Sequence, residues 1–165
     1  MVIAIISDTH DNIPNLKKCL NWCLSHEVEK IFFCGDITTE ETLYLLAKKF
    51  RGEIFLTNGN ADLFDAKKIT NLKNVNYQAE VGLIKIGDMR IGFCHEPQKI
   101  KRVLSLSPVP PHFIFYGHTH TPWIEKQGSV NIINPGNLAG TFHQATFAVL
   151  DTSNKKLELK ILADL

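Results

Sequence analysis

The sequence predicts an α/β protein in which two β-sheets pack face to face and helices flank them. Five apolar runs of strand length each end in a cluster of Gly, Asp, Asn or His. Amphipathic segments separate the earlier runs, which is typical of parallel strands joined by right-handed crossovers. With 165 residues, of which 44% are hydrophobic, residues 1–165 are expected to form one domain. The five runs are residues 3–6, 31–34, 54–57, 91–94 and 113–116.

The first third of the chain is predicted to be a β-α-β-α-β unit. After a strand at residues 2–6, Asn12 can cap a helix with Pro14 in its first turn, and its apolar positions recur at helical spacing. A second strand follows at residues 30–34. Residues 38–41 have the capping-box pattern and are expected to start a second helix, which leads to a strand near residues 53–57.

The pattern changes beyond Asp62, where a polar stretch leads to a predicted hairpin. Residues 81–86 and 89–94 flank a Gly87-Asp88 turn, which favours two antiparallel strands. A short helix is expected over residues 98–106, and the proline-rich segment that follows cannot continue it. The remaining candidate strands are residues 112–116, 123–126, 130–133, 146–150 and 156–162.

Composition sets limits on partners and location. Eighteen basic and seventeen acidic side chains give a formal charge of +1, so no strong electrostatic preference for nucleic acid or an anionic membrane is expected, and tight binding of polyanions is disfavoured. The short basic run at residues 99–102 is interpreted as a solvated helix face. No segment approaches the ~20 apolar residues of a membrane span, and the N-terminal run lacks a basic leader, so a cytoplasmic protein is expected. The four cysteines are expected to be core residues.

Polar side chains at the ends of the five runs predict a metal site. Because the carboxyl ends of strands in such sheets meet in one crevice, these side chains are expected to converge. Taken singly, each is more often structural; an Asn beside Gly, for example, is usually a turn residue. Together they supply carboxylate, amide and imidazole ligands suited to Mn²⁺, Fe²⁺ or Zn²⁺. The candidate ligands are Asp8, His10, Asp36, Asn60, His95, His118 and His120.

These motifs, in this order, resemble those of the calcineurin-like metallophosphoesterases, and the short chain is similar to their small bacterial and archaeal phosphodiesterase branch. The turn at residues 134–137 matches a further motif of that branch. The resemblance covers essentially the whole chain and implies a four-layer α/β/β/α sandwich of two mixed sheets with a dinuclear metal site. It implies that Asp36 is shared by two divalent ions, with Mn²⁺ favoured and Fe, Zn or Ni as alternatives. One ion would be held by Asp8, His10, Asp36 and His120, the other by Asp36, Asn60, His95 and His118.

The expected activity is hydrolysis of a small phosphodiester, including nucleotide derivatives, by a metal-bridging hydroxide. Asn60 and His95 are candidate catalytic residues, because they could also direct polar hydrogens at the phosphate oxygens. A phosphomonoesterase or a nuclease could use the same site. A different class also stays open, namely a weakly catalytic or non-catalytic scaffold that resembles the small retromer subunit. Self-association into a homo-oligomer is compatible with the sequence but is not indicated by it.

Two positions depart from the family pattern. Many members have a His directly after the motif Asn, where it protonates the leaving group, but this chain has Ala61 and then Asp62. Asp62 could act as the acid or could position a ligand. Members also often have Gly where this chain has Glu96, which is expected to alter the mouth of the pocket or to add a negative charge near the anionic substrate.

Overall fold

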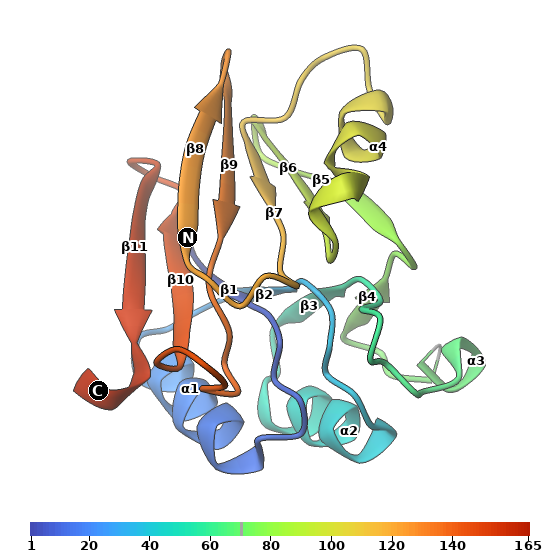
Figure 1. The fold of residues 1–165 in the computed structure, drawn as a ribbon, viewed down its shortest axis with the longest axis vertical. Coiled ribbons are helices and arrows are strands. Elements are labelled where there is room, and N and C mark those ends of the chain that lie inside the picture. Colours follow the sequence, from blue (N-terminus) through green and yellow to red (C-terminus); the bar gives the residue numbers. More distant parts are fainter. Residues whose placement is uncertain (70) are drawn as a thin grey trace.

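The computed structural model, which describes residues 1–69 and 71–165, contains a six-stranded and a five-stranded sheet that face each other (Figure 1). The first sheet has the order β11-β10-β1-β2-β3-β4, and the second has the order β5-β6-β7-β9-β8. The strands of the first sheet are β1 (Val2–Ile6), β2 (Lys30–Phe33), β3 (Glu53–Leu56), β4 (Val75–Tyr77), β10 (Thr146–Asp151) and β11 (Lys156–Ile161). Those of the second are β5 (Val81–Ile86), β6 (Met89–Cys94), β7 (Phe113–Phe115), β8 (Trp123–Gln127) and β9 (Val130–Asn134).

Both sheets are mixed, as expected. Strands β1 to β4 are parallel, while β10 joins β1 in the antiparallel sense. In the second sheet β6, β7 and β9 are parallel, and β5 and β8 pair antiparallel at the two edges. The parallel strands of each sheet therefore end on a common side, which is where polar side chains can gather.

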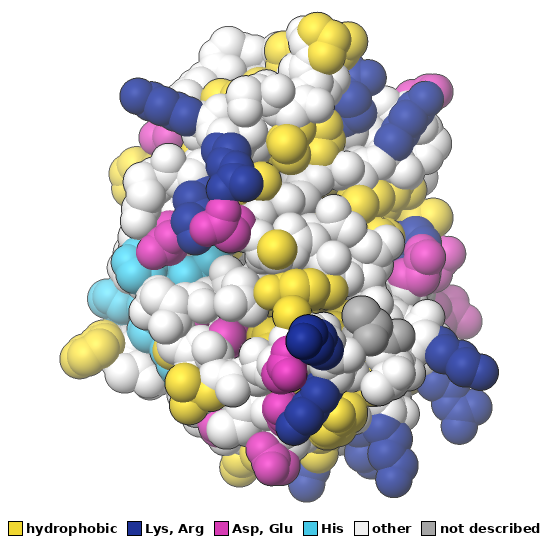
Figure 2. Space-filling view, turned by 90° about the vertical axis from the view of Figure 1, so that its right-hand side faces the viewer, with side chains coloured by type: hydrophobic (Ala, Val, Ile, Leu, Met, Phe, Trp, Pro, Cys, Tyr) yellow, Lys and Arg dark blue, Asp and Glu magenta, His cyan; other side chains and the backbone are white. Residues whose placement is uncertain are grey.

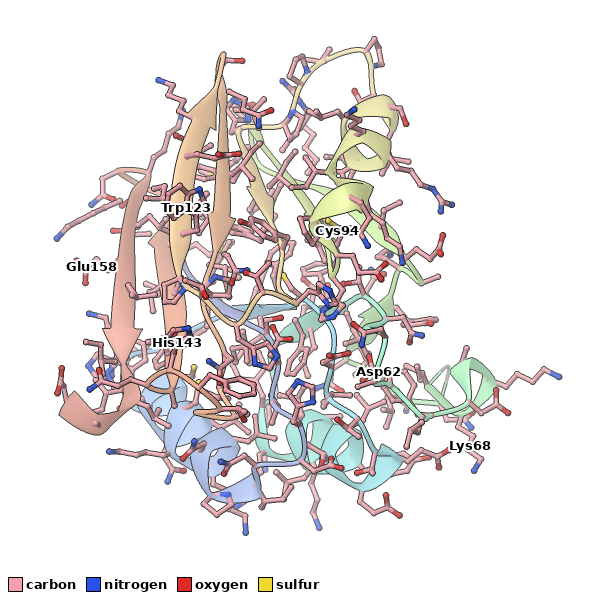
Figure 3. The ribbon with its side chains drawn as sticks, in the orientation of Figure 1. Asp62, Lys68, Cys94, Trp123, His143 and Glu158 are labelled. Atoms are coloured by element: carbon pink, nitrogen blue, oxygen red, sulfur yellow. The ribbon has the colours of Figure 1, made fainter. Side chains whose placement is uncertain are left out.

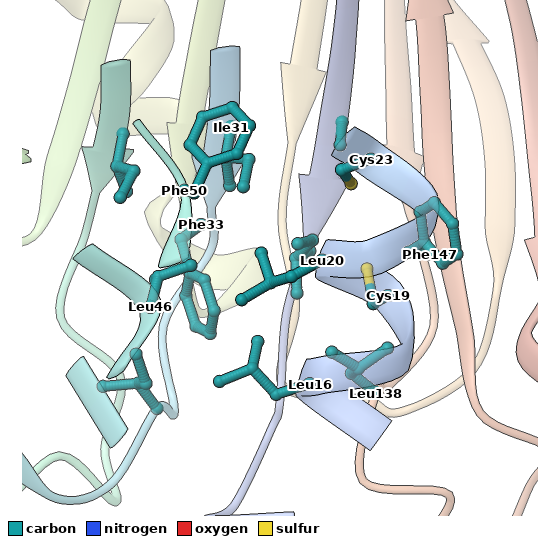
Figure 4. Packing of buried hydrophobic residues seen from close by; sticks show 14 of the residues in the cluster. Leu16, Cys19, Leu20, Cys23, Ile31, Phe33, Leu46, Phe50, Leu138 and Phe147 are labelled. Carbon is teal, nitrogen blue, oxygen red and sulfur yellow. The ribbon is translucent and has the colours of Figure 1, made fainter. Parts of the chain in front are cut away.

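Helices cover the outer faces of the two sheets, which completes the four-layer arrangement. Figure 4 shows α1 packed on the first sheet through apolar side chains, and α2 contributes Leu43 and Leu46 to the same cluster. Helix α4 packs Val103 against the second sheet. The helices are α1 (Ile13–Ser25), α2 (Glu40–Lys49), α3 (Ala66–Ile69) and α4 (Ile100–Ser105), with 3₁₀ turns η1 (Pro97–Lys99) and η2 (Leu162–Asp164).

The continuous apolar runs arise because the central strands are buried on both faces. In β1, Ile3 and Ile5 point between the sheets, whereas Ala4 and Ile6 face the helices. Phe32 lies in the inter-sheet layer, where its ring is stacked at 4.9 Å from that of Phe55. Such strands read as uninterrupted apolar segments instead of alternating ones.

Two elements were not anticipated from the sequence, and one capping expectation was wrong. The polar stretch after Asp62 contains α3 and the edge strand β4, both too short to leave a periodic pattern. Helix α2 does begin after Thr39, but the Thr39 side chain makes no cap bond. Instead, the carboxylate of Asp11 accepts hydrogen bonds from the Thr39 backbone N–H and hydroxyl and from the Thr42 hydroxyl. A carboxylate from the loop before α1 thus anchors the start of this helix.

The four cysteines are free and buried, in agreement with their expected role in the core. Burial raises the pKa of the Cys94 thiol to about 12 and also raises the pKa of Cys34. Neither thiol is therefore ionised near neutral pH. Within residues 1–69 and 71–165, no helix combines the length and the apolar character needed to cross a membrane.

Candidate metal centre

The structure brings all seven predicted ligand side chains together at the side where the parallel strands end. Each lies in a loop that follows one of the strands β1, β2, β3, β6 and β7. Figure 2 shows histidine side chains gathered at one place on the surface of the molecule. Asp8, Asp36 and His95 are buried, whereas Asn60 and His118 are exposed. The carboxylates thus lie at the buried floor of the cluster, and its other end is open to solvent.

One half of the cluster is formed around Asp8. The His120 Nε2 atom lies 3.2 Å from Asp8 Oδ1 and 3.2 Å from His10 Nε2. His10 Nε2 also lies 3.5 Å from Asp36 Oδ2. Ligand atoms of Asp8, His10 and His120 all lie within 4.8 Å of one another, close enough to hold one ion.

The other half is formed around Asp36 and Asn60. His95 Nε2 lies 3.4 Å from Asp36 Oδ2 and 2.9 Å from Asn60 Oδ1. His118 Nδ1 lies 2.8 Å from the same amide oxygen. Because Asp36 Oδ2 is near both His10 and His95, this one carboxylate oxygen lies between the two halves.

The donor set fits a cation better than it fits a network of hydrogen bonds. His95 Nδ1 lies 2.7 Å from the carbonyl oxygen of Cys34, which can only accept, so Nδ1 carries the proton. In neutral His95, Nε2 then carries a lone pair and is an acceptor. It faces two further acceptors, Asp36 Oδ2 and Asn60 Oδ1. Three acceptors directed at one another need a positive charge between them. A divalent ion supplies it with ordinary nitrogen and oxygen ligands.

Electrostatics in the cluster point the same way. Burial alone would raise the pKa of Asp36, but the hydrogen bond and charge of His95 outweigh it and hold this pKa below its ordinary value. For His95, burial alone would lower the pKa, but the Asp36 hydrogen bond and the Asp8 and Asp36 charges raise it. Hydrogen bonding to Asp8 likewise raises the pKa of His120. The carboxylates therefore attract positive charge, which either protons or a metal ion can provide.

The backbone is strained at most of these positions. A positive φ is uncommon for residues other than Gly, because Cβ approaches the following carbonyl oxygen. Such strain concentrates at sites where function requires it. Here it occurs at five of the seven candidate ligands: Asp8 (54°), His10 (44°), Asp36 (59°), His118 (69°) and His120 (58°).

Two glycines allow the ligand loops to pack this closely. A Cβ atom on Gly59 would lie 2.0 Å from Asp36 Oδ1, and one on Gly117 would lie 1.9 Å from the Ser7 hydroxyl. Neither gap can hold a carbon atom, so any side chain there would displace a loop. The Gly in each of these motifs is explained by this close approach.

Asp62 joins the second and third ligand loops. Its carboxylate accepts the backbone N–H groups of Gly59 (2.7 Å), Thr38 (2.8 Å) and Asp36 (3.2 Å). In return, the backbone N–H of Ala61 donates to Asp36 Oδ1 at 2.8 Å. Burial raises the pKa of Asp62 even though these hydrogen bonds favour its ionised form. The contacts describe a residue that positions the loops around Asp36.

Asn137 is a second positioning residue, and the only signal for it in the sequence is the turn motif of residues 134–137. Its amide nitrogen donates to the carbonyl oxygen of His120 at 3.0 Å. Its amide oxygen accepts the N–H groups of Gly140 (2.6 Å) and Thr141 (3.0 Å). The segment after β9 is thereby tied to the loop of His120. In the view of Figure 3, the labelled residues Asp62 and His143 lie on either side of the loops that carry the candidate ligands.

Glu96, directly after His95, does not present an uncompensated charge. Its carboxylate lies 2.7 Å from the Lys99 ammonium, and the hydrogen bond from Lys99 lowers the pKa of Glu96. Lys99 in turn lies 3.6 Å from Glu80. The departure at this position therefore adds an ion pair beside the site, which weakens the repulsion that a lone carboxylate would exert on an anionic substrate.

Comparison with known proteins shows to which protein family this arrangement belongs. The model of the calcineurin-like phosphoesterase superfamily domain matches residues 1–155. Phosphodiesterase MJ0936 of Methanocaldococcus jannaschii is 28% identical over 162 residues, which cover 94% of this chain and 96% of that protein. A solved structure described as a novel archaeal phosphodiesterase has a TM-score of 0.86 at 26% identity and covers 98% of this chain and 99% of its own. The zinc complex of Vps29 from Entamoeba histolytica shares the fold, with a TM-score of 0.71 at 19% identity over 98% of this chain and 99% of its own.

Fold, site and comparisons together define a phosphoric ester hydrolase. The chain belongs to the calcineurin-like phosphoesterase superfamily. The sequence-based expectations of this family, of its small archaeal and bacterial branch and of the mixed two-sheet fold are confirmed.

Proposed function

We propose that this chain is a divalent-metal-dependent phosphodiesterase that hydrolyses a small phosphate diester at a dinuclear site. The observation that carries the proposal is the convergence of three acceptor atoms. Asp36 Oδ2 lies 3.4 Å from His95 Nε2, and Asn60 Oδ1 lies 2.9 Å from it. The similarity to phosphodiesterase MJ0936 supports a diester as the substrate class.

We assign the ligands in two sets that share Asp36. Asp8, His10 and His120 with Asp36 would hold one ion, and Asn60, His95 and His118 with Asp36 would hold the other. Mn²⁺ is the proposed native metal because the set mixes carboxylate, amide and imidazole ligands, and Fe, Zn or Ni are the alternatives. Two such ions would lower the pKa of a bound water and neutralise charge on the phosphoryl oxygens.

Asn60 and His95 have different parts in this proposal. Asn60 is exposed at the mouth and directs its amide oxygen into the cluster, which leaves its amide nitrogen free to donate to a phosphate oxygen. His95 is buried and donates Nδ1–H to the Cys34 carbonyl oxygen, which fixes the direction of Nε2. His95 would therefore act through the geometry it imposes on the cluster.

The test is hydrolysis of bis-p-nitrophenyl phosphate and p-nitrophenyl phosphate by metal-stripped protein to which Mn²⁺ is returned. We expect metal-dependent release that is faster with the diester. The Asp36→Ala variant should lose one or both ions, measured as bound metal per chain, and essentially all activity. Full metal content and rate in that variant would exclude the shared-carboxylate assignment. Faster release from the monoester would favour a phosphomonoesterase.

A scaffold of the same fold is the second candidate, because Vps29 chains share this architecture. The similarity to phosphodiesterase MJ0936, at 28% identity over 94% of this chain, favours the enzyme. Absence of turnover with every divalent ion, in protein that binds metal and is folded, would make the scaffold the leading assignment.

A further inference from the structure

Phe142 is the most exposed large hydrophobic side chain among the residues that the structure describes, with 90% of its surface accessible. It lies in the exposed segment of residues 140–144, between the Asn137 turn and β10. An isolated exposed aromatic residue forgoes the favourable free energy of burial. Phe142 also has a φ of 65°, which is unfavourable for a side chain of this size. Two local costs at one residue indicate that the position of this ring serves a purpose.

The ring stands beside the proposed metal cluster. Its centroid lies 6.5 Å from that of the His120 imidazole, at a tilt of 42°. The neighbouring residue, His143, is also exposed and places Nε2 at 3.4 Å from the Thr121 hydroxyl, in the loop that follows His120. Phe142 and His143 therefore border the mouth of the site on the side of His120.

The base of this segment is fixed to the ligand loops. Asn137 bonds the carbonyl oxygen of His120 and the N–H groups of Gly140 and Thr141. The N–H of Ala139 donates to the carbonyl oxygen of Asp8 at 2.9 Å. Phe142 is thus presented on a short extension from a base that is bonded to two of the ligand loops, which keeps the ring in register with them.

We propose that Phe142 is a stacking platform for the nucleobase, or an equivalent flat aromatic group, of the phosphodiester substrate. The inference rests on the proposed function, since it takes the metal cluster as the place of the phosphate. A phosphate held there leaves the base of a nucleotide within reach of a ring adjacent to His120. Stacking on an aromatic side chain is tolerant of base identity. Phe142 would therefore select nucleotide-derived diesters without selecting among bases.

The experiment compares AMP with ribose 5-phosphate, which differ by the base, in calorimetric titrations of the Mn²⁺-loaded protein. The wild-type chain should bind AMP about fivefold or more tightly than ribose 5-phosphate, which is the lower end of measured stacking effects. Phe142→Ala should remove this preference and leave the affinity for ribose 5-phosphate unchanged. Phe142→Trp should keep the preference. The matched control is Val109→Ala, another exposed apolar residue, located before the amino end of β7 and so away from the site.

Equal affinity of the wild-type chain for the two probes, or an undiminished preference for AMP in Phe142→Ala, would overturn the platform. In either case continued hydrolysis of bis-p-nitrophenyl phosphate would leave the proposed function standing. Binding of neither probe, together with no hydrolysis, would overturn both. A change in oligomeric state of Phe142→Ala, measured by light scattering, without a change in probe preference would assign the ring to a contact between copies and refute the platform.

Discussion

The layer between the sheets and the loops at the ends of the strands follow opposite rules. The layer is made of apolar side chains from regular strands, such as Ile3, Phe32 and Phe115. The loops gather carboxylates and imidazoles on a backbone that is left-handed at five of the seven candidate ligands. The first region contributes stability. The second lowers it, because clustered acceptor groups and strained backbone residues are unfavourable without a bound ion. The rigid layer is what allows the loops to be held in this state.

The largest expected effect on folding is in the layer. Phe32→Ala should lower the free energy of unfolding by about 3–5 kcal/mol, because the Phe32 ring is fully buried against the rings of Phe55 and Phe93. Urea denaturation of metal-free protein measures this change. The molecules that remain folded should keep their affinity for Mn²⁺. A loss of less than about 1 kcal/mol would show that the layer is not the main source of stability.

A substitution at the boundary should separate activity from stability. Gly59→Ala places a carbon 2.0 Å from Asp36 Oδ1 and should displace this carboxylate. We expect a loss of about 100-fold in kcat/KM for bis-p-nitrophenyl phosphate, the usual scale for misplacing a reacting group by 1 Å. Gly128→Ala is the control, because no atom lies within 4 Å of its new Cβ. Its φ of 60° makes Ala unfavourable there, so this variant should lose some stability but keep its activity. Equal activity of Gly59→Ala and the wild-type chain would mean that Asp36 is not needed in its present place.

Asp62 gives the next test, because its two possible roles predict different kinetics. If Asp62 positions the loops through its hydrogen bonds from three backbone N–H groups, Asp62→Asn should lower kcat/KM about 10–100-fold with all esters and should weaken Mn²⁺ binding. As a general acid it would lose rate only with poor leaving groups. A series of aryl phosphodiesters with leaving groups of increasing pKa distinguishes the two. We expect parallel losses across the series; a loss that grows with leaving-group pKa would contradict this expectation.

Metal affinity should increase with pH. The carboxylates raise the pKa values of His95 and His120, so both imidazoles keep their protons to higher pH in the metal-free chain. A metal ion must displace these protons, and its apparent affinity should rise about tenfold per pH unit for each proton released, until the imidazoles are neutral. Titrations with Mn²⁺ in two buffers of different ionisation enthalpy give the proton count. A Mn²⁺ affinity that does not change between pH 6 and 8 would show that the metal displaces no protons from these imidazoles.

The fold and the convergence of the candidate ligands were predictable from the sequence for the same physical reason. Strands buried on both faces leave unbroken apolar runs, and their ends are marked by abrupt polar clusters, as at Asp8 and His95. The positioning contacts were not predictable, because they join distant loops through single side chains. Asp11 anchors the start of α2, and Asp62 links the Asp36 and Asn60 loops. The proposed role of Phe142 was not predictable either, because it rests on the exposure of its ring beside His120.

The smallest expected effect concerns the strained backbone itself. His10 has a φ of 44°, so His10→Gly and His10→Ala remove the same imidazole but differ in the strain of Cβ. In metal-free protein the Gly variant should be more stable than the Ala variant by about 0.5–1 kcal/mol. This is the cost of a left-handed conformation for Ala, less the greater conformational entropy that Gly loses on folding. Thermal denaturation in the presence of a chelator measures the difference.

The same pair at Lys17, an exposed position within α1, provides the control with the opposite sign. There the Ala variant should be more stable than the Gly variant by about 1 kcal/mol, as in other helix interiors. If Ala were the more stable residue at both positions, the strain at His10 would not be a cost to the fold. If the order reverses as expected, the loop of His10 carries a conformational cost that folding alone does not require, in agreement with the proposed metal-binding geometry.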